Sequence, residues 1–204
     1  MCGIAGIIHR GKSSNVGREM TSMLQALRHR GPDSTGFAVY GGSKPGDILM
    51  RIKVAEREDM DKGRGILKRI KERVAGVDMI LHEHGATIKE SENATPYALR
   101  YVINHDGNTE EMAQHLEEIE GVEILSLGRG LELIKDLGDA TAVSDTYGLD
   151  SFKGTHAIGH ARMATESDVD IRSAHPGFAS KRQLNDPIGH TRPSHHTQAH
   201  TAAR

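Results

Sequence analysis

The only cysteine of this chain is its second residue, directly behind the initiator methionine, and it opens the run CGIAGII at residues 2–8. A methionine followed by so small a residue is readily removed, which would leave a thiol and a free α-amine on Cys2. An α-amine has a pKa of about 7.7 to 8.0, so it can take the thiol proton near neutral pH. Cys2 is therefore a candidate nucleophile that carries its own base. The alternative is that a lone cysteine fills a core as a small apolar residue.

Two further segments belong with this N-terminus. They are the turn RGPDSTG at residues 30–36 and the run GHARMAT at residues 159–165. In kind and order, the three segments resemble the class II glutamine amidotransferases, whose glutaminase domains use an N-terminal nucleophile. The long stretch before Gly159 and the residues around Arg162 look most like the small amidotransferase-type subunits related to glutamate synthase, including that of N-methylglutamate synthase. The resemblance covers the chain from Cys2 to about Pro176.

The resemblance implies a role for four residues. Cys2, after loss of Met1, would attack the side-chain amide of glutamine, giving a glutamyl thioester and ammonia, and water would then release glutamate. Arg162 matches the family arginine that holds the substrate α-carboxylate, a task suited to its planar fork of donors. Thr165 would add a hydroxyl contact to the same group, and Arg30 would help to close the site. The alternative for Arg162 is a surface salt bridge.

The same resemblance implies an α+β fold, an αββα sandwich of two antiparallel sheets that is incomplete at its C-terminal end. A glutamine amidotransferase domain would span residues 2–176, with a small α/β lobe inserted at about 45–152. Residues 177–204 match nothing and have little to bury, so we expect a disordered tail. Apolar spacing predicts these elements: strands at 2–8, 37–40, 48–54, 97–103, 122–127 and 155–164, and helices at 15–28, 66–74, 109–119 and 131–137.

The sequence departs from the family pattern after the arginine motif. The family continues through an Asn-Gly pair that forms the oxyanion hole and an acidic residue that binds the substrate α-amine, and neither occurs at the expected place. This favours an alternative function, a non-catalytic or truncated subunit that serves as a structural module of a glutamate synthase or N-methylglutamate synthase complex. We hypothesise that the sequence after about Pro176 is an out-of-frame or truncated end. A sandwich without its later strands would expose apolar faces.

Composition limits the remaining possibilities. One cysteine in 204 residues excludes an internal disulfide, which favours a reducing, cytoplasmic setting. The apolar run before His9 is too short for a signal peptide or a membrane span. A net charge of -2 with interspersed signs predicts no attraction to nucleic acid or membrane. His82 and His84 lack a carboxylate or cysteine partner, so we predict no metal site. No cofactor is expected in this chain, and FMN or iron-sulfur centres would belong to synthase-type partner subunits.

Overall fold

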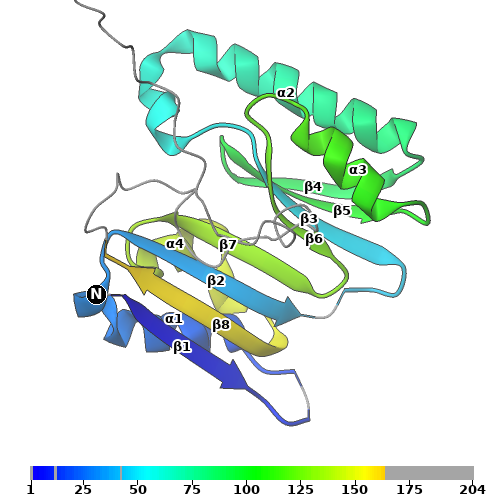
Figure 1. Ribbon diagram of the computed structural model, residues 1–204. Coiled ribbons are helices and arrows are strands. Elements are labelled where there is room, and N and C mark those ends of the chain that lie inside the picture. Colours follow the sequence, from blue (N-terminus) through cyan, green and yellow to red (C-terminus); the bar gives the residue numbers. More distant parts are fainter. Residues whose placement is uncertain (1, 12, 42, 164–204) are drawn as a thin grey trace, which may run out of the picture.

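The computed structural model describes residues 2–11, 13–41 and 43–163. The α+β class is confirmed. Within these residues, four α-helices accompany two antiparallel sheets of four strands each, an arrangement compatible with a sandwich (Figure 1). None of the helices in these ranges is both long and apolar enough to cross a membrane.

The first sheet joins both ends of the described chain and has the strand order β1-β8-β2-β7. Its strands are β1 (Gly3–Ile8), β2 (Ser34–Gly41), β7 (Leu131–Leu137) and β8 (Gly154–Arg162), and its helices are α1 (Val16–Ala26) and α4 (Ala140–Tyr147). Met20 and Leu24 of α1 are completely buried against Phe37 of β2. Met20 and Leu24 can approach the backbone of β8 closely because Gly159 has no side chain. A Cβ at this position would lie 2.5 Å from Leu24 Cδ1.

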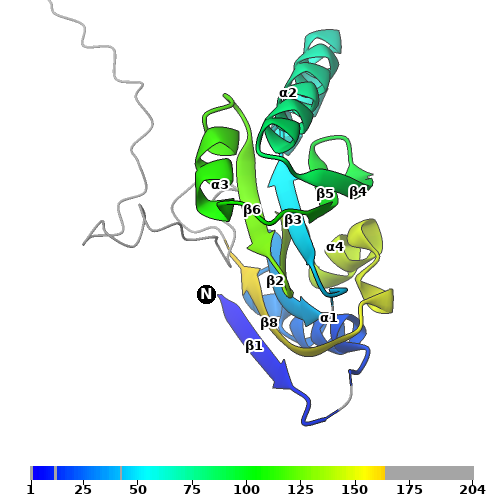
Figure 2. The same ribbon diagram turned by 90° about the vertical axis from the view of Figure 1, so that its right-hand side faces the viewer.

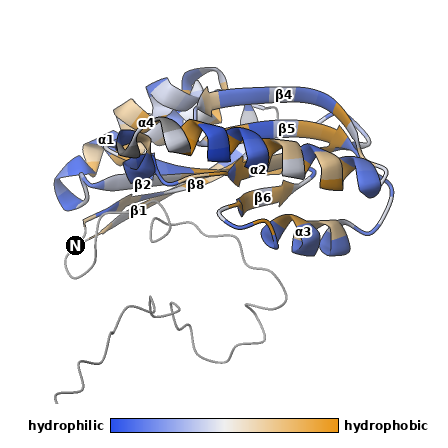
Figure 3. Cartoon of the chain, turned by 90° about the horizontal axis from the view of Figure 1, so that it is seen from above, coloured by the Kyte–Doolittle hydropathy of each residue, from blue (hydrophilic) through white to orange (hydrophobic). Residues whose placement is uncertain are grey.

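The second sheet is built from consecutive elements and has the order β4-β5-β3-β6. It comprises β3 (Asp47–Lys53), β4 (Thr87–Thr95), β5 (Ala98–Asn104) and β6 (Glu123–Gly128), with α2 (Arg64–Glu83) and α3 (Thr109–Glu117). The helices bury one face each in a core of their own, which includes Ile66, Leu81 and Met112. Figure 2 shows α2 and α3 beside this sheet, and Figure 3 shows hydrophilic and hydrophobic residues alternating around both helices.

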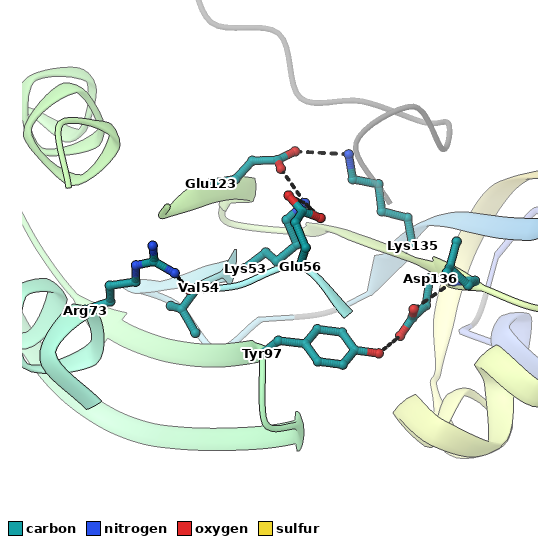
Figure 4. A network of polar contacts seen from close by, with 9 residues as sticks. Lys53, Val54, Glu56, Arg73, Tyr97, Glu123, Lys135 and Asp136 are labelled. Atoms are coloured by element: carbon teal, nitrogen blue, oxygen red, sulfur yellow. Dashed lines mark hydrogen bonds and ion pairs between the residues drawn. The ribbon is translucent and has the colours of Figure 1, made fainter. Parts of the chain in front are cut away.

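The two sheets meet at β7 through charged groups. Glu132 of β7 is 2% exposed and accepts hydrogen bonds from Arg51 Nε at 2.6 Å and Arg100 Nε at 2.9 Å. A second cluster, drawn in Figure 4, joins Lys53 Nζ to Glu123 at 2.8 Å and Glu123 to Lys135 Nζ at 3.1 Å. Buried charges are tolerated where each is paired and hydrogen-bonded. The junction is therefore a polar contact between two separate apolar cores.

The segment 131–137 is a strand, not the expected helix. Leu133 and Leu137 are four residues apart, as on one face of a helix, yet Glu132 pairs with Val39 and Ile134 with Phe37 in the ladder with β2. Both β7 and α4 pack with the first sheet, although they fall inside the range 45–152 given to the inserted lobe. The division of the chain into domains stays a prediction.

The face of the first sheet opposite its helices carries exposed isoleucines. Ile4 and Ile8 of β1 are 73% and 79% exposed, and Ile158 of β8 is 50% exposed. In the ladder Ile158 lies opposite Gly6, so all three side chains project from one face. Since β1 is the edge strand, this corner of the sheet combines an open ladder with apolar surface.

Candidate active site

Cys2 directly precedes the edge strand β1, and it is exposed. β1 and β8 run antiparallel with Gly3 opposite Ala161. The first residues of the chain are therefore next to the last residues of β8, where Arg162 ends the strand. Figure 1 shows the N-terminus beside the arrowhead of β8.

The turn at residues 30–36 reaches the same end of the sheet from the other side. A single 3₁₀ turn, η1 (Arg28–Arg30), precedes Gly31, whose backbone packs directly on β8. The Asp33 amide donates to the Arg162 carbonyl at 3.1 Å, and Ser34 then pairs with Arg162 in the β2–β8 ladder. The three segments that the sequence singled out thus converge, with Cys2 and Arg30 exposed and Arg162 half-buried.

This arrangement brings a cysteine and two arginines to one end of the first sheet. A thiol can form a covalent acyl intermediate once it is deprotonated. An arginine is suited to bidentate recognition of a carboxylate. A substrate with a carboxylate and an electrophilic carbonyl is therefore the chemistry that this edge can serve.

Thr165 lies outside the described residues, as does the segment after Pro176. The assignment of Thr165 and the hypothesis of a truncated or out-of-frame end both stay predictions.

Ser34 is a feature of this edge that the sequence did not single out as a site residue. It is completely buried, and its Oγ has no hydrogen-bond partner among the described residues. Only its place in the turn motif gave a signal. Its neighbour Thr35 donates from Oγ1 to the Gly138 carbonyl at 2.8 Å, and the Gly138 amide donates to the Asp33 carbonyl at 2.9 Å. The turn is thus held from β7 as well as from β8.

One member of the histidine pair considered from the sequence has a partner outside the pair. His84 forms a hydrogen bond with His115, with 2.7 Å between Nε2 and Nδ1, rather than acting with His82. Across the described ranges, no group of three or more His, Cys, Asp or Glu side chains is arranged to hold a metal ion.

Replacing Gly31 with alanine is expected to displace the end of β8. An added Cβ would lie 2.4 Å from the Ala161 carbonyl carbon and 2.5 Å from the Arg162 nitrogen, both of them backbone atoms. Because φ is -173°, the cost comes from space rather than from backbone conformation. We expect a loss of about 1 to 3 kcal/mol in the free energy of unfolding, measured by urea denaturation.

The matched control is Gly6→Ala, where the nearest atom to the new Cβ is the Ala157 carbonyl oxygen at 3.9 Å. This change should stay within about 0.5 kcal/mol of the unmodified protein. Equal stability of the two variants would contradict the close packing of Gly31 on β8.

Comparison with known proteins adds two relatives, and no protein-family model matches the chain. The "Putative glutamine amidotransferase" of Methanothermobacter thermautotrophicus is 40% identical over 179 residues, which cover 86% of this chain and 56% of that protein. The "Glutamine amidotransferase-like protein GlxB" of Rhizobium meliloti is 28% identical over 178 residues, which cover 86% of this chain and 54% of that protein. The chain thus spans about half the length of the curated relatives it matches.

Proposed function

We propose that this chain is a glutamine amidotransferase of class II, in which Cys2 hydrolyses the side-chain amide of glutamine. The observation that carries the proposal is the convergence of Cys2, the turn beginning at Arg30, and Arg162 at one end of the first sheet. The similarity to two proteins with amidotransferase names supports it. The chemistry needs a nucleophile, a base and a clamp for the α-carboxylate, and these residues can supply all three.

In the proposed reaction the α-amine of Cys2 accepts the thiol proton, and Sγ attacks the amide carbon of glutamine. The C–S bond forms, the C–N bond breaks, and the proton leaves with ammonia. Water then attacks the glutamyl thioester, the C–S bond breaks, and glutamate departs as the thiol regains its proton. Arg162 holds the α-carboxylate throughout, Thr165 adds a hydroxyl contact to the same group, and Arg30 helps to close the site.

The ammonia would pass to a synthase-type partner. We propose a relation to the small subunits of glutamate synthase and N-methylglutamate synthase, with FMN or iron-sulfur centres in the partner subunits and a cytoplasmic setting. The single cysteine agrees with a reducing compartment.

The second candidate function is a non-catalytic module of such a complex. The observation that favours it is the sequence after Arg162, which lacks the Asn-Gly pair and acidic residue at the place where the family has them. Removing a single oxyanion donor costs about 2.7 to 4 kcal/mol of transition-state stabilisation in a studied protease. A chain without that hole would keep the fold but turn over little glutamine.

Incubation with 6-diazo-5-oxo-norleucine, a glutamine analogue that alkylates glutaminase cysteines, tests the first candidate against the second. We expect an intact mass that lacks Met1 and gains one adduct, with excess glutamine slowing its formation. Since Cys2 is the only cysteine, a thiol adduct can be assigned without ambiguity. Iodoacetamide is the control for access to the thiol. Labelling by iodoacetamide alone, or retention of Met1, would overturn the glutaminase proposal and favour the structural module.

A further inference from the structure

A cleft of about 650 Å³ opens where the two sheets meet, away from Cys2. Its walls come from the end of β4 and the turn that follows it, from the end of β7, from α4, and from Arg57 of the 3₁₀ segment η2 (Arg57–Lys62). The volume is within the usual range of small-molecule sites. A junction between two packed units is also a common place for such sites.

The floor of the cleft is the buried carboxylate of Asp136, which is 3% exposed. Its Oδ2 accepts hydrogen bonds from the hydroxyl groups of Tyr97 at 2.7 Å and Tyr147 at 3.0 Å, and its Oδ1 accepts one from the Leu137 amide at 2.7 Å. The contact with Tyr97 is drawn in Figure 4. Burial, together with the neighbouring carboxylate, raises the pKa of both tyrosines, so they remain donors at neutral pH. The carboxylate of Asp136 therefore has three hydrogen-bond donors besides any ion pair with a nearby arginine.

Arg57 lies at the mouth of the cleft, and part of its guanidinium group makes no hydrogen bond to the residues that the structure describes. Its Nη1 donates to the Leu137 carbonyl at 3.2 Å and lies 3.7 Å from Asp136 Oδ1. The side chain is 50% exposed, and its Nε and Nη2 make no hydrogen bond within the described residues. A guanidinium group has five N–H donors, and two on adjacent nitrogens match the oxygens of one carboxylate.

The remaining walls are largely apolar. Ala94 lies near the end of β4, Pro96 lies in the β4–β5 turn, and Ala142 and Val143 come from α4. These side chains offer contact to carbon atoms but no charge, so Arg57 is the one cation among the lining residues that the structure describes. A ligand with two negative charges would have no cation among these described residues for its second charge, which would be repelled by the carboxylate of Asp136.

We propose that this cleft binds a small organic monoanion, with its carboxylate on Arg57 and an apolar body of a few carbons between the β4–β5 turn and α4. The site is separate from the Cys2 edge. Gly138 lines the cleft, and its amide donates to the Asp33 carbonyl of the turn at 2.9 Å.

The test compares 4-phenylbutyrate with its neutral isostere 4-phenylbutanamide, using ligand-observed NMR titrations of the full chain. We expect the carboxylate to bind at least about tenfold more tightly than the amide, the scale of one charge-assisted hydrogen bond. Arg57→Gln should remove that preference, and Ala142→Leu should weaken both compounds by filling the cleft. The control Arg69→Gln, an exposed arginine of α2 outside the cleft, should change neither.

Several outcomes would overturn the proposal. They are no binding of the carboxylate, equal binding of the two compounds, or an Arg57→Gln variant that keeps the preference while folded by circular dichroism. If the compounds bound instead to the apolar sheet face of Ile4, Ile8 and Ile158, neither Arg57→Gln nor Ala142→Leu would change their affinity. The variants therefore separate the cleft from the apolar sheet face.

Discussion

Replacing Cys2 with alanine is expected to abolish the release of ammonia from glutamine, with a loss on the order of 10⁶-fold in kcat, the scale seen when a nucleophile is removed from a studied protease. Alanine is as readily exposed by loss of Met1 as cysteine, so the α-amine is retained and the thiol alone is removed. Because Cys2 is exposed, the free energy of unfolding should stay within about 0.5 kcal/mol. Ammonia would be followed by a coupled assay and stability by urea denaturation.

Ser22→Ala serves as the matched control. Ser22 lies on the exposed side of α1, where its Oγ donates to the Arg18 carbonyl at 3.1 Å. The glutaminase activity of Ser22→Ala should equal that of the unmodified chain. If the Cys2→Ala variant kept comparable turnover, Cys2 would not be the nucleophile, whatever the labelling experiment gave.

Glu132→Gln is expected to have the largest effect on stability. Glu132 bridges two guanidinium groups, and the side chains of Arg51 and Glu132 are only 10% and 2% exposed. Burial lowers the pKa of Arg51, and the charge of Glu132 opposes that shift. Removing the carboxylate leaves Arg51 charged, buried and without its counter-ion, which costs about 3 to 5 kcal/mol in comparable cases. Urea denaturation at neutral pH measures the difference.

Acid should reduce that difference. Burial by itself would raise the pKa of Glu132, but the charge of Arg51 and the hydrogen bonds from Arg100 hold it below its usual value. A depressed folded-state pKa gives stability that is present above the unfolded value of about 4.3 and lost as the pH falls through the folded value. The difference in the free energy of unfolding between the unmodified protein and Glu132→Gln should therefore become smaller below about pH 4.

The control is Glu72→Gln, which removes an exposed pair with Lys68 on α2, where the side chains are 61% and 81% exposed. Such pairs contribute about 0 to 1 kcal/mol, so this variant should differ little from the unmodified protein. Equal losses for the two glutamates would show that the buried network does not hold the sheets together.

The elements that the sequence predicted best are those with a regular apolar period. Val16, Met20 and Leu24 recur at helical spacing and are all completely buried in α1. β4 had no such signal, because eight of its nine residues are exposed and its register comes from pairing with β5. The prediction of a helix at β7 was wrong for a related reason. Its polar residues are buried by partners far along the chain, such as Arg51, which is 81 residues from Glu132.

The candidate site could be found from the sequence because its residues lie in short motifs. The type and order of those motifs singled out Cys2, Arg30 and Arg162 as candidates, and the structure brings their segments together through the pairing of β1 and β2 with β8. The close contact of Gly31 with β8 and the buried hydroxyl of Ser34 depend on backbone positions that no local pattern specifies. The cleft beside Arg57 was unforeseen because its walls come from four separate segments.

The position of Cys2 one residue ahead of β1 links the choice of translation start site to activity. β1 is held by its ladder with β8 from Gly3 onward, so extra residues before Cys2 would leave the register unchanged. Under the proposed chemistry, however, they would convert the α-amine into an amide that cannot accept a proton. Initiation at an upstream codon, or an N-terminal affinity tag that is not removed, would thus yield a folded but inert protein.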